Sequence, residues 1–202
     1  MREEKVRFLS EGLSIEGLLC IQRGERGVVI THPHPLYGGS MYNQVVEALV
    51  TVYQDKGFST LRFNLRGTGD SEGSYDHGKG EQEDVRSALR YLYDRGKRRL
   101  DLAGYSFGAW VNAKITNTES MLSSMIMVSP PVTFLDFSFL SFNPKIEAVI
   151  TGGRDDIAAV DRIRTLIDTW NPDAHLEVIE GADHFYSGRI DTLKSVLSRI
   201  IH

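Results

Sequence analysis

The segment Leu100–Lys114 reads LDLAGYSFGAWVNAK, and it decides the fold. Its centre, Gly104–Gly108, is a G-x-S-x-G pattern with Ser106 in the middle. The apolar residues before the pattern predict a short buried strand, and the residues after it predict a helix. A tight turn between a strand and a helix lifts a serine hydroxyl out of the sheet. The two glycines are needed because side chains there would collide with the neighbouring strand and helix. The segment therefore predicts a nucleophilic serine, and the alternative is a plain strand-to-helix turn.

The rest of the chain alternates short apolar runs with longer amphipathic stretches, which is typical of strands and helices around a mostly parallel sheet. An antiparallel hairpin is expected at the N-terminus. We expect strands at Lys5–Ser10, Leu13–Ile21, Gly27–Thr31, Phe58–Phe63, Leu100–Ala103, Met125–Val128, Ala148–Thr151 and Leu176–Ile179. We expect helices at Met41–Tyr53, Gly80–Arg95 and Phe107–Asn117, one carrying Val160, Ile163 and Ile167, and one carrying Ile190, Leu193, Val196, Leu197 and Ile200. With 202 residues and no repeat or linker, the sequence predicts one α/β domain over residues 1–202.

Composition narrows the function classes. Hydrophobic residues make up 41% of the chain and charged residues 25%, which is ordinary for a globular protein. The net charge is −4, so a general nucleic-acid or membrane-surface binder is not expected. No apolar run reaches the roughly 18 residues that span a bilayer, and the charged N-terminus lacks the apolar core of a signal peptide. A single cysteine, Cys20, forms no internal disulfide, so a cytoplasmic location is expected.

A serine hydroxyl becomes a good nucleophile when a neighbouring base takes its proton, and histidine is the usual base. His184 lies in the sequence GADHF, just beyond the last predicted strand. It therefore reaches the same edge of the sheet as Ser106, because the carboxyl ends of parallel strands meet there. His175 starts that strand and lies at the wrong end, and His202 is terminal. We predict that His184 is the catalytic base.

A third group must hold the imidazole tautomer and stabilise the imidazolium, and a carboxylate does so. The sequence GGRDD follows the predicted strand Ala148–Thr151. Asp155 is the preferred residue and Asp156 the alternate, and the one that is not used would cap the next helix. Asp183 is a poorer candidate, because adjacent residues seldom aim their side chains at each other.

The combination of motifs resembles the α/β-hydrolase superfamily, and more narrowly its small, lid-poor predicted hydrolases. The resemblance spans nearly the whole chain from about Leu13. The matching segments are HPHPLYGGSM at 32–41, RFNLRGTGDSEG at 62–73, YDHG at 75–78, GYSFG at 104–108, the acidic loop at 152–156 and GADHF at 181–185. This resemblance implies the α/β-hydrolase fold without a cap domain, and an esterase or thioesterase-like activity. It does not define the substrate.

The oxyanion hole of such an enzyme needs two preorganised donors, usually backbone N–H groups. Phe107, which follows the nucleophile, supplies one. Many family members carry H-G after the third strand, whereas this chain carries His32-Pro33. Proline has no N–H. The second donor is therefore His34, Leu36 or Tyr37, with His34 preferred and Leu36 second.

Three further features are open to more than one interpretation. The pair His32 and His34 could bind a metal, but no other group has metal-ligand spacing, so neither a metal nor a cofactor is expected. His77 either lines the site or fixes its loop, and the latter is favoured. The phenylalanines of Ser129–Pro144 form either an aromatic wall for an acyl chain or part of the core, and about fifteen residues are too few for a cap domain.

The sequence thus predicts a serine hydrolase with Ser106, His184 and Asp155 as its triad and a small acyl ester or thioester as substrate. A serine peptidase or amidase, a metal-dependent hydrolase and a non-catalytic binding protein on the same scaffold are the alternatives. The frequency of symmetric dimers among proteins favours a homodimer.

Overall fold

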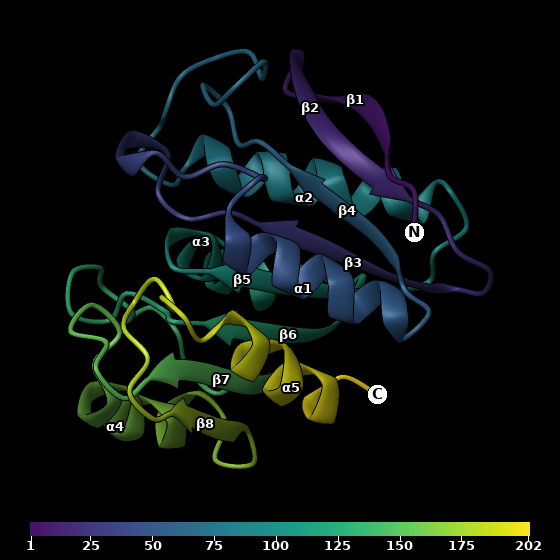
Figure 1. Ribbon diagram of the computed structural model, residues 1–202. Helices are drawn as coiled ribbons and strands as arrows, with labels where there is room; N and C mark the ends of the chain where they lie inside the picture. Colours follow the sequence, from purple (N-terminus) through teal and green to yellow (C-terminus); the bar gives the residue numbers. More distant parts are fainter.

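The computed structural model describes residues 1–202 and contains one eight-stranded sheet in the order β1-β2-β4-β3-β5-β6-β7-β8 (Figure 1). The strands are β1 (Glu4–Ser10), β2 (Leu13–Cys20), β3 (Arg26–Thr31), β4 (Ser59–Phe63), β5 (Arg99–Tyr105), β6 (Leu122–Val128), β7 (Ile146–Gly152) and β8 (His175–Ile179). Strand β2 pairs antiparallel with both β1 and β4, and all other pairs are parallel. The predicted fold class, a mostly parallel sheet with an antiparallel N-terminal hairpin, is therefore confirmed.

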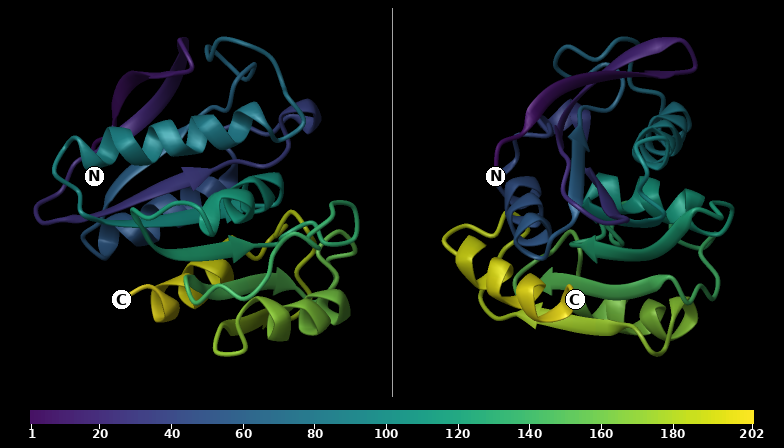
Figure 2. Two further views of the ribbon diagram at one scale, coloured as in Figure 1. Left: turned by 180° about the vertical axis from the view of Figure 1, so that it is seen from behind. Right: turned by 90° about the vertical axis from the view of Figure 1, so that its right-hand side faces the viewer.

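Five helices cover the sheet on both faces. They are α1 (Gln44–Asp55), α2 (Gly80–Tyr93), α3 (Phe107–Thr116), α4 (Val160–Trp170) and α5 (Ile190–Ile200). Helices α1 and α5 lie on one face, and α2, α3 and α4 lie on the other (Figure 2). Each face therefore has its own apolar core, and the strands between them are buried on both sides.

One predicted helix start and one predicted helix cap differ from the structure. Helix α1 begins at Gln44 rather than Met41, because Asn43 caps it: its side chain accepts a 2.9 Å hydrogen bond from the N–H of Val45. Residues Pro35–Tyr37, which precede this helix, form a short 3₁₀ turn. Helix α4 begins at Val160 and has no side-chain cap, so neither Asp155 nor Asp156 caps it.

No helix in this chain combines the length and apolar character needed to cross a membrane.

The carboxyl ends of β3, β5, β7 and β8 meet at one edge of the sheet. All parallel strands run in the same direction, so the loops that follow them are neighbours although they are far apart in the sequence. These loops carry every site residue that the sequence predicts.

Candidate active site

Ser106 occupies a strained turn between β5 and α3. Its backbone has φ 54° and ψ −119°, a conformation that is uncommon for a residue with a side chain. A Cβ atom on Gly104 would lie 2.6 Å from the backbone nitrogen of Ala109 in α3. A Cβ atom on Gly108 would lie 2.5 Å from Oγ1 of Thr31 in β3. These collisions explain why both flanking positions are glycine.

Three side chains from three loops form one hydrogen-bonded chain. The Oγ atom of Ser106 lies 3.0 Å from Nε2 of His184. On the other side of the ring, Nδ1 of His184 lies 3.0 Å from Oδ1 and 2.9 Å from Oδ2 of Asp155. All three residues are buried. The structure thus brings together the serine, the histidine and the preferred carboxylate in the order that proton transfer requires.

The Asp155 carboxylate is fixed by its own loop as well as by His184. Oδ1 accepts hydrogen bonds from the N–H groups of Ile157 (2.9 Å) and Ala158 (2.7 Å). Burial raises the pKa of Asp155, but the hydrogen bond from His184, the charge of its ring and the loop N–H donors outweigh burial and hold the pKa below its usual value. The carboxylate is therefore ionised at neutral pH.

The other two acidic candidates lie outside this hydrogen-bonded chain. Asp156 is exposed. Asp183 accepts a 3.0 Å hydrogen bond from the N–H of Ser187 within its own loop, and this contact holds its pKa low. Neither residue contacts the histidine ring.

Of the three candidate donors in the loop after β3, only the N–H of His34 lacks a hydrogen-bond partner, and His34 lines the same cavity as Ser106. The N–H groups of residues 36–39 all bond within the loop: that of Leu36 to Nδ1 of His34, those of residues 37 and 39 to the His34 carbonyl, and that of residue 38 to the Pro35 carbonyl. The N–H of His34 has no partner. Phe107 is the first residue of α3, so its N–H has no partner within the helix. The rings of His34 and Phe107 are 4.7 Å apart.

His32 is buried and joins two loops. Its Nδ1 bonds to the carbonyl of Pro33 (2.6 Å), and its Nε2 accepts a 3.0 Å hydrogen bond from the N–H of Leu65. Burial lowers the pKa of His32 to about 4, although the bond to Pro33 opposes this effect. The ring is therefore neutral, and both nitrogens are occupied by backbone groups. Nowhere in the chain do three His, Cys, Asp or Glu side chains gather as a metal site would require.

His77 is exposed, and its ring packs against that of Tyr75 at 4.8 Å. It does not line the cavity at Ser106. Its contact with the neighbouring loop residue agrees with the structural role that the sequence favours.

A cavity of about 650 Å³ opens at Ser106. No Asp, Glu, Lys or Arg side chain lines it. Three aromatic residues from three separate loops line it and remain largely exposed: Tyr37 (88%), Phe134 (72%) and Phe185 (61%). The cavity therefore offers an uncharged, aromatic surface beside the reactive serine.

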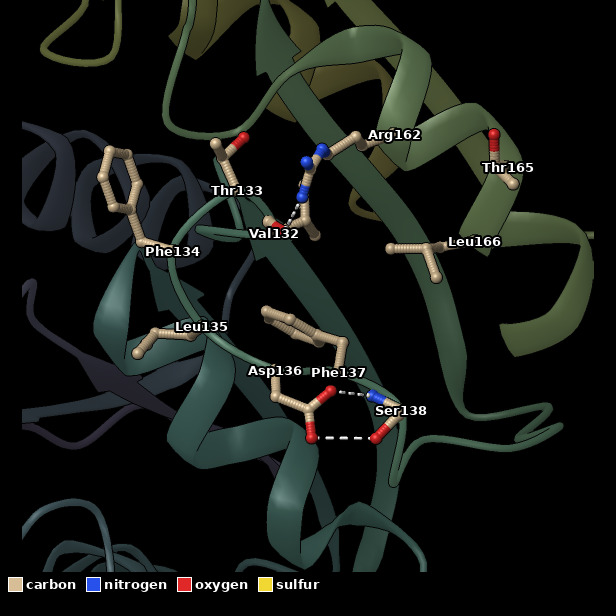
Figure 3. A pocket seen from close by; sticks show the side chains of 10 residues that line it. All are labelled: Val132, Thr133, Phe134, Leu135, Asp136, Phe137, Ser138, Arg162, Thr165 and Leu166. Carbon is tan, nitrogen blue, oxygen red and sulfur yellow. Dashed lines mark hydrogen bonds between the residues drawn. The ribbon is translucent and has the colours of Figure 1, made fainter.

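The phenylalanines of the segment from Ser129 to Pro144 divide between the cavity and the core. Phe134 lines the cavity at Ser106, whereas Phe137 is buried and packs against Trp170 with ring centres 5.2 Å apart. Phe134, Phe137 and Leu166 all line a second hollow of about 560 Å³, and Figure 3 shows Phe134 on the opposite side of the segment from Leu166. The segment is thus a thin wall beside the site.

Sequence reasoning missed two side chains that hold the histidine loop. The hydroxyl of Tyr105 donates a 2.8 Å hydrogen bond to the carbonyl of His184, and Nε2 of Gln44 donates one of 2.9 Å to the carbonyl of Phe185. Tyr105 is a variable position of G-x-S-x-G, and Gln44 lies in a helix 141 residues away from Phe185. No spacing pattern relates these residues to the loop.

Comparison with known proteins gives consistent matches. The model of the alpha/beta hydrolase family matches residues 28–190. Protein RP471 of Rickettsia prowazekii is 32% identical over 180 residues, which cover 84% of this chain and 76% of that protein.

Two solved structures are similar over nearly their whole length. The alpha-beta serine hydrolase homologue from Coxiella burnetii superimposes with a TM-score of 0.92 and 31% identity, covering 100% of this chain and 99% of that one. XC6422 from Xanthomonas campestris, described as a serine hydrolase without a lid, has a TM-score of 0.89 and 26% identity, covering 98% of this chain and 93% of that one.

Proposed function

The chain belongs to the alpha/beta hydrolase family, and on that premise we propose that it is a serine hydrolase that cleaves carboxylic esters or thioesters through an acyl-enzyme. The hydrogen-bonded chain from Ser106 through His184 to Asp155 carries this proposal. It supplies a nucleophile, a base and a group that holds the base in the required tautomer.

In the first half of the reaction, Ser106 Oγ attacks the carbonyl carbon while Nε2 of His184 takes the hydroxyl proton. Negative charge develops on the carbonyl oxygen, which accepts hydrogen bonds from the free N–H groups of Phe107 and His34. His184 then gives its proton to the leaving alcohol or thiol, and the acyl group stays on Ser106.

In the second half, His184 takes a proton from water, which attacks the acyl-enzyme. The tetrahedral intermediate collapses, the proton returns to Ser106, and the carboxylic acid leaves. Asp155 stays ionised throughout and stabilises the imidazolium. The base must be neutral to take the Ser106 proton.

The cavity supports a neutral substrate with an apolar or aromatic group. None of its lining residues is a carboxylate, lysine or arginine that would bind a charged group. Its three exposed aromatic rings can pack against an apolar part of the substrate.

A fluorophosphonate probe tests the proposal. The nucleophilic oxygen displaces fluoride and stays bonded to phosphorus, so mass spectrometry of the folded protein should find the adduct on Ser106. Hydrolysis of short p-nitrophenyl esters and acyl thioesters should be lost in Ser106→Ala. A panel that adds aminoacyl amides separates the esterase from a peptidase. An unlabelled Ser106, or turnover that survives Ser106→Ala, would reject the proposal.

A further inference from the structure

A pair of hydroxyl groups links the loop that carries His184 to the end of β6. The hydroxyl of Tyr186 lies 2.9 Å from Oγ of Ser129, although 57 residues separate them. Both residues are fully buried. A buried hydroxyl without a partner would be unfavourable, so this contact satisfies both groups in the interior. It joins two loops that flank the catalytic carboxylate.

Both residues have a backbone conformation that is uncommon for non-glycine residues. Ser129 has φ 45° and Tyr186 has φ 56°. Glycine adopts this region at little cost, and asparagine or aspartate tolerates it better than tyrosine does. Strained residues of this kind persist where the surrounding structure requires their side chains, and they cluster at functional sites. Both strained residues here take part in one hydroxyl–hydroxyl contact.

The pair belongs to the loops on either side of the one that carries Asp155. Ser129 follows β6, Asp155 follows β7, and His184 and Tyr186 follow β8, and these three strands are neighbours in the sheet. Oδ1 of Asp155 accepts hydrogen bonds from two loop N–H groups, and Nδ1 of His184 lies 3.0 Å from Oδ1 and 2.9 Å from Oδ2. Although burial raises the pKa of Asp155, the hydroxyl of Ser129 is among the groups that lower it.

We propose that the Tyr186–Ser129 hydroxyl pair is a positioning device that holds His184 in register with Asp155. Either hydroxyl can donate in this contact; when Tyr186 donates to Ser129 Oγ, the Ser129 proton is left for the Asp155 carboxylate. The pair therefore fixes the carboxylate and the histidine loop relative to each other, and it acts on the reaction only through them. This proposal rests on the proposed function of the Ser106 site.

The test removes one hydroxyl at a time. In Tyr186→Phe and in Ser129→Ala, we expect kcat for a p-nitrophenyl ester to fall about three- to tenfold while KM stays unchanged, because misplacing a catalytic group slows the chemical step. The double variant should lose no more than the worse single variant, because both substitutions break one contact. In addition, the Nδ1 proton of His184, observed by NMR, should exchange with solvent faster in both variants.

Tyr53→Phe is the matched control. Tyr53 is also a buried tyrosine, but its hydroxyl has no partner, and it lies on α1 away from the cavity. This variant should keep kcat and the exchange rate of the Nδ1 proton. The proposal is overturned if Tyr186→Phe and Ser129→Ala behave like Tyr53→Phe in both measurements, or if only their melting temperatures change. If the parent protein shows no Ser106-dependent turnover, the proposed function fails, and the exchange rates still decide whether the pair positions His184.

Discussion

The Oγ atom of Ser106 lies 3.0 Å from Nε2 of His184, although 78 residues separate them in the chain. The serine follows β5 and the histidine follows β8, with two strands between them in the sheet. Ser106 lies in the tight turn directly after β5, and the loop after β8 brings His184 to it. The contact exists because the parallel strands end at one edge of the sheet.

Asp155→Asn should reduce kcat by roughly 10³–10⁴-fold, because the amide favours the wrong imidazole tautomer and cannot stabilise the imidazolium. The amide oxygen can still accept the loop N–H groups, so the fold should persist. Steady-state kinetics with a p-nitrophenyl ester and a circular dichroism melt check both statements. Asp156→Asn is the control, because Asp156 is exposed, and it should retain activity. A fully active Asp155→Asn would remove the carboxylate from the mechanism.

A comparison of His34→Pro with His34→Ala separates the role of the backbone N–H from the role of the ring. The backbone φ of His34 is −56°, which proline adopts without strain. His34→Ala removes the ring and keeps the N–H, so it is the matched control. If this N–H holds the oxyanion, kcat of His34→Pro should be about 10²–10³-fold below that of His34→Ala. Equal kcat values in the two variants would assign the second donor elsewhere.

His32 should make the protein less stable as the pH falls below neutral. Burial lowers its pKa in the folded state to about 4, whereas the value for an exposed histidine is 6.5. Above pH 6.5 the ring is neutral in both states, so its full contribution is present. Between pH 6.5 and 4 the unfolded chain binds the proton first, and the free energy of unfolding should drop by about 3 kcal/mol.

Urea unfolding between pH 4 and 8 measures this loss. His32→Gln, which keeps a hydrogen-bonding side chain without a titrating ring, should give a flatter curve over the same range. Because buried carboxylates also respond to acid, the difference between the two curves is the relevant quantity. Identical slopes would show that another group is responsible.

Much of the fold was predictable because hydrophobic periodicity within a short stretch of sequence indicates a strand or a helix. The apolar run before Ser106 and the helix after it follow from periodicity, and the G-x-S-x-G pattern follows from the absence of space at Gly104 and Gly108. The start of α1 was missed because the signal is a single capping side chain, Asn43, beside a 3₁₀ turn that periodicity does not reveal.

Hydrophobic period and turn chemistry are local properties, so the amino-acid chain alone specifies the elements, their approximate limits and the residue types that reach the reactive edge. Folding then fixes which carboxylate contacts His184, which candidate N–H of the loop after β3 lacks a partner, and which hydroxyls bond to the histidine loop. These choices depend on distances between segments far apart in the chain. Asp155 and Asp156 differ by one position in the sequence, yet one contacts the ring and the other faces solvent.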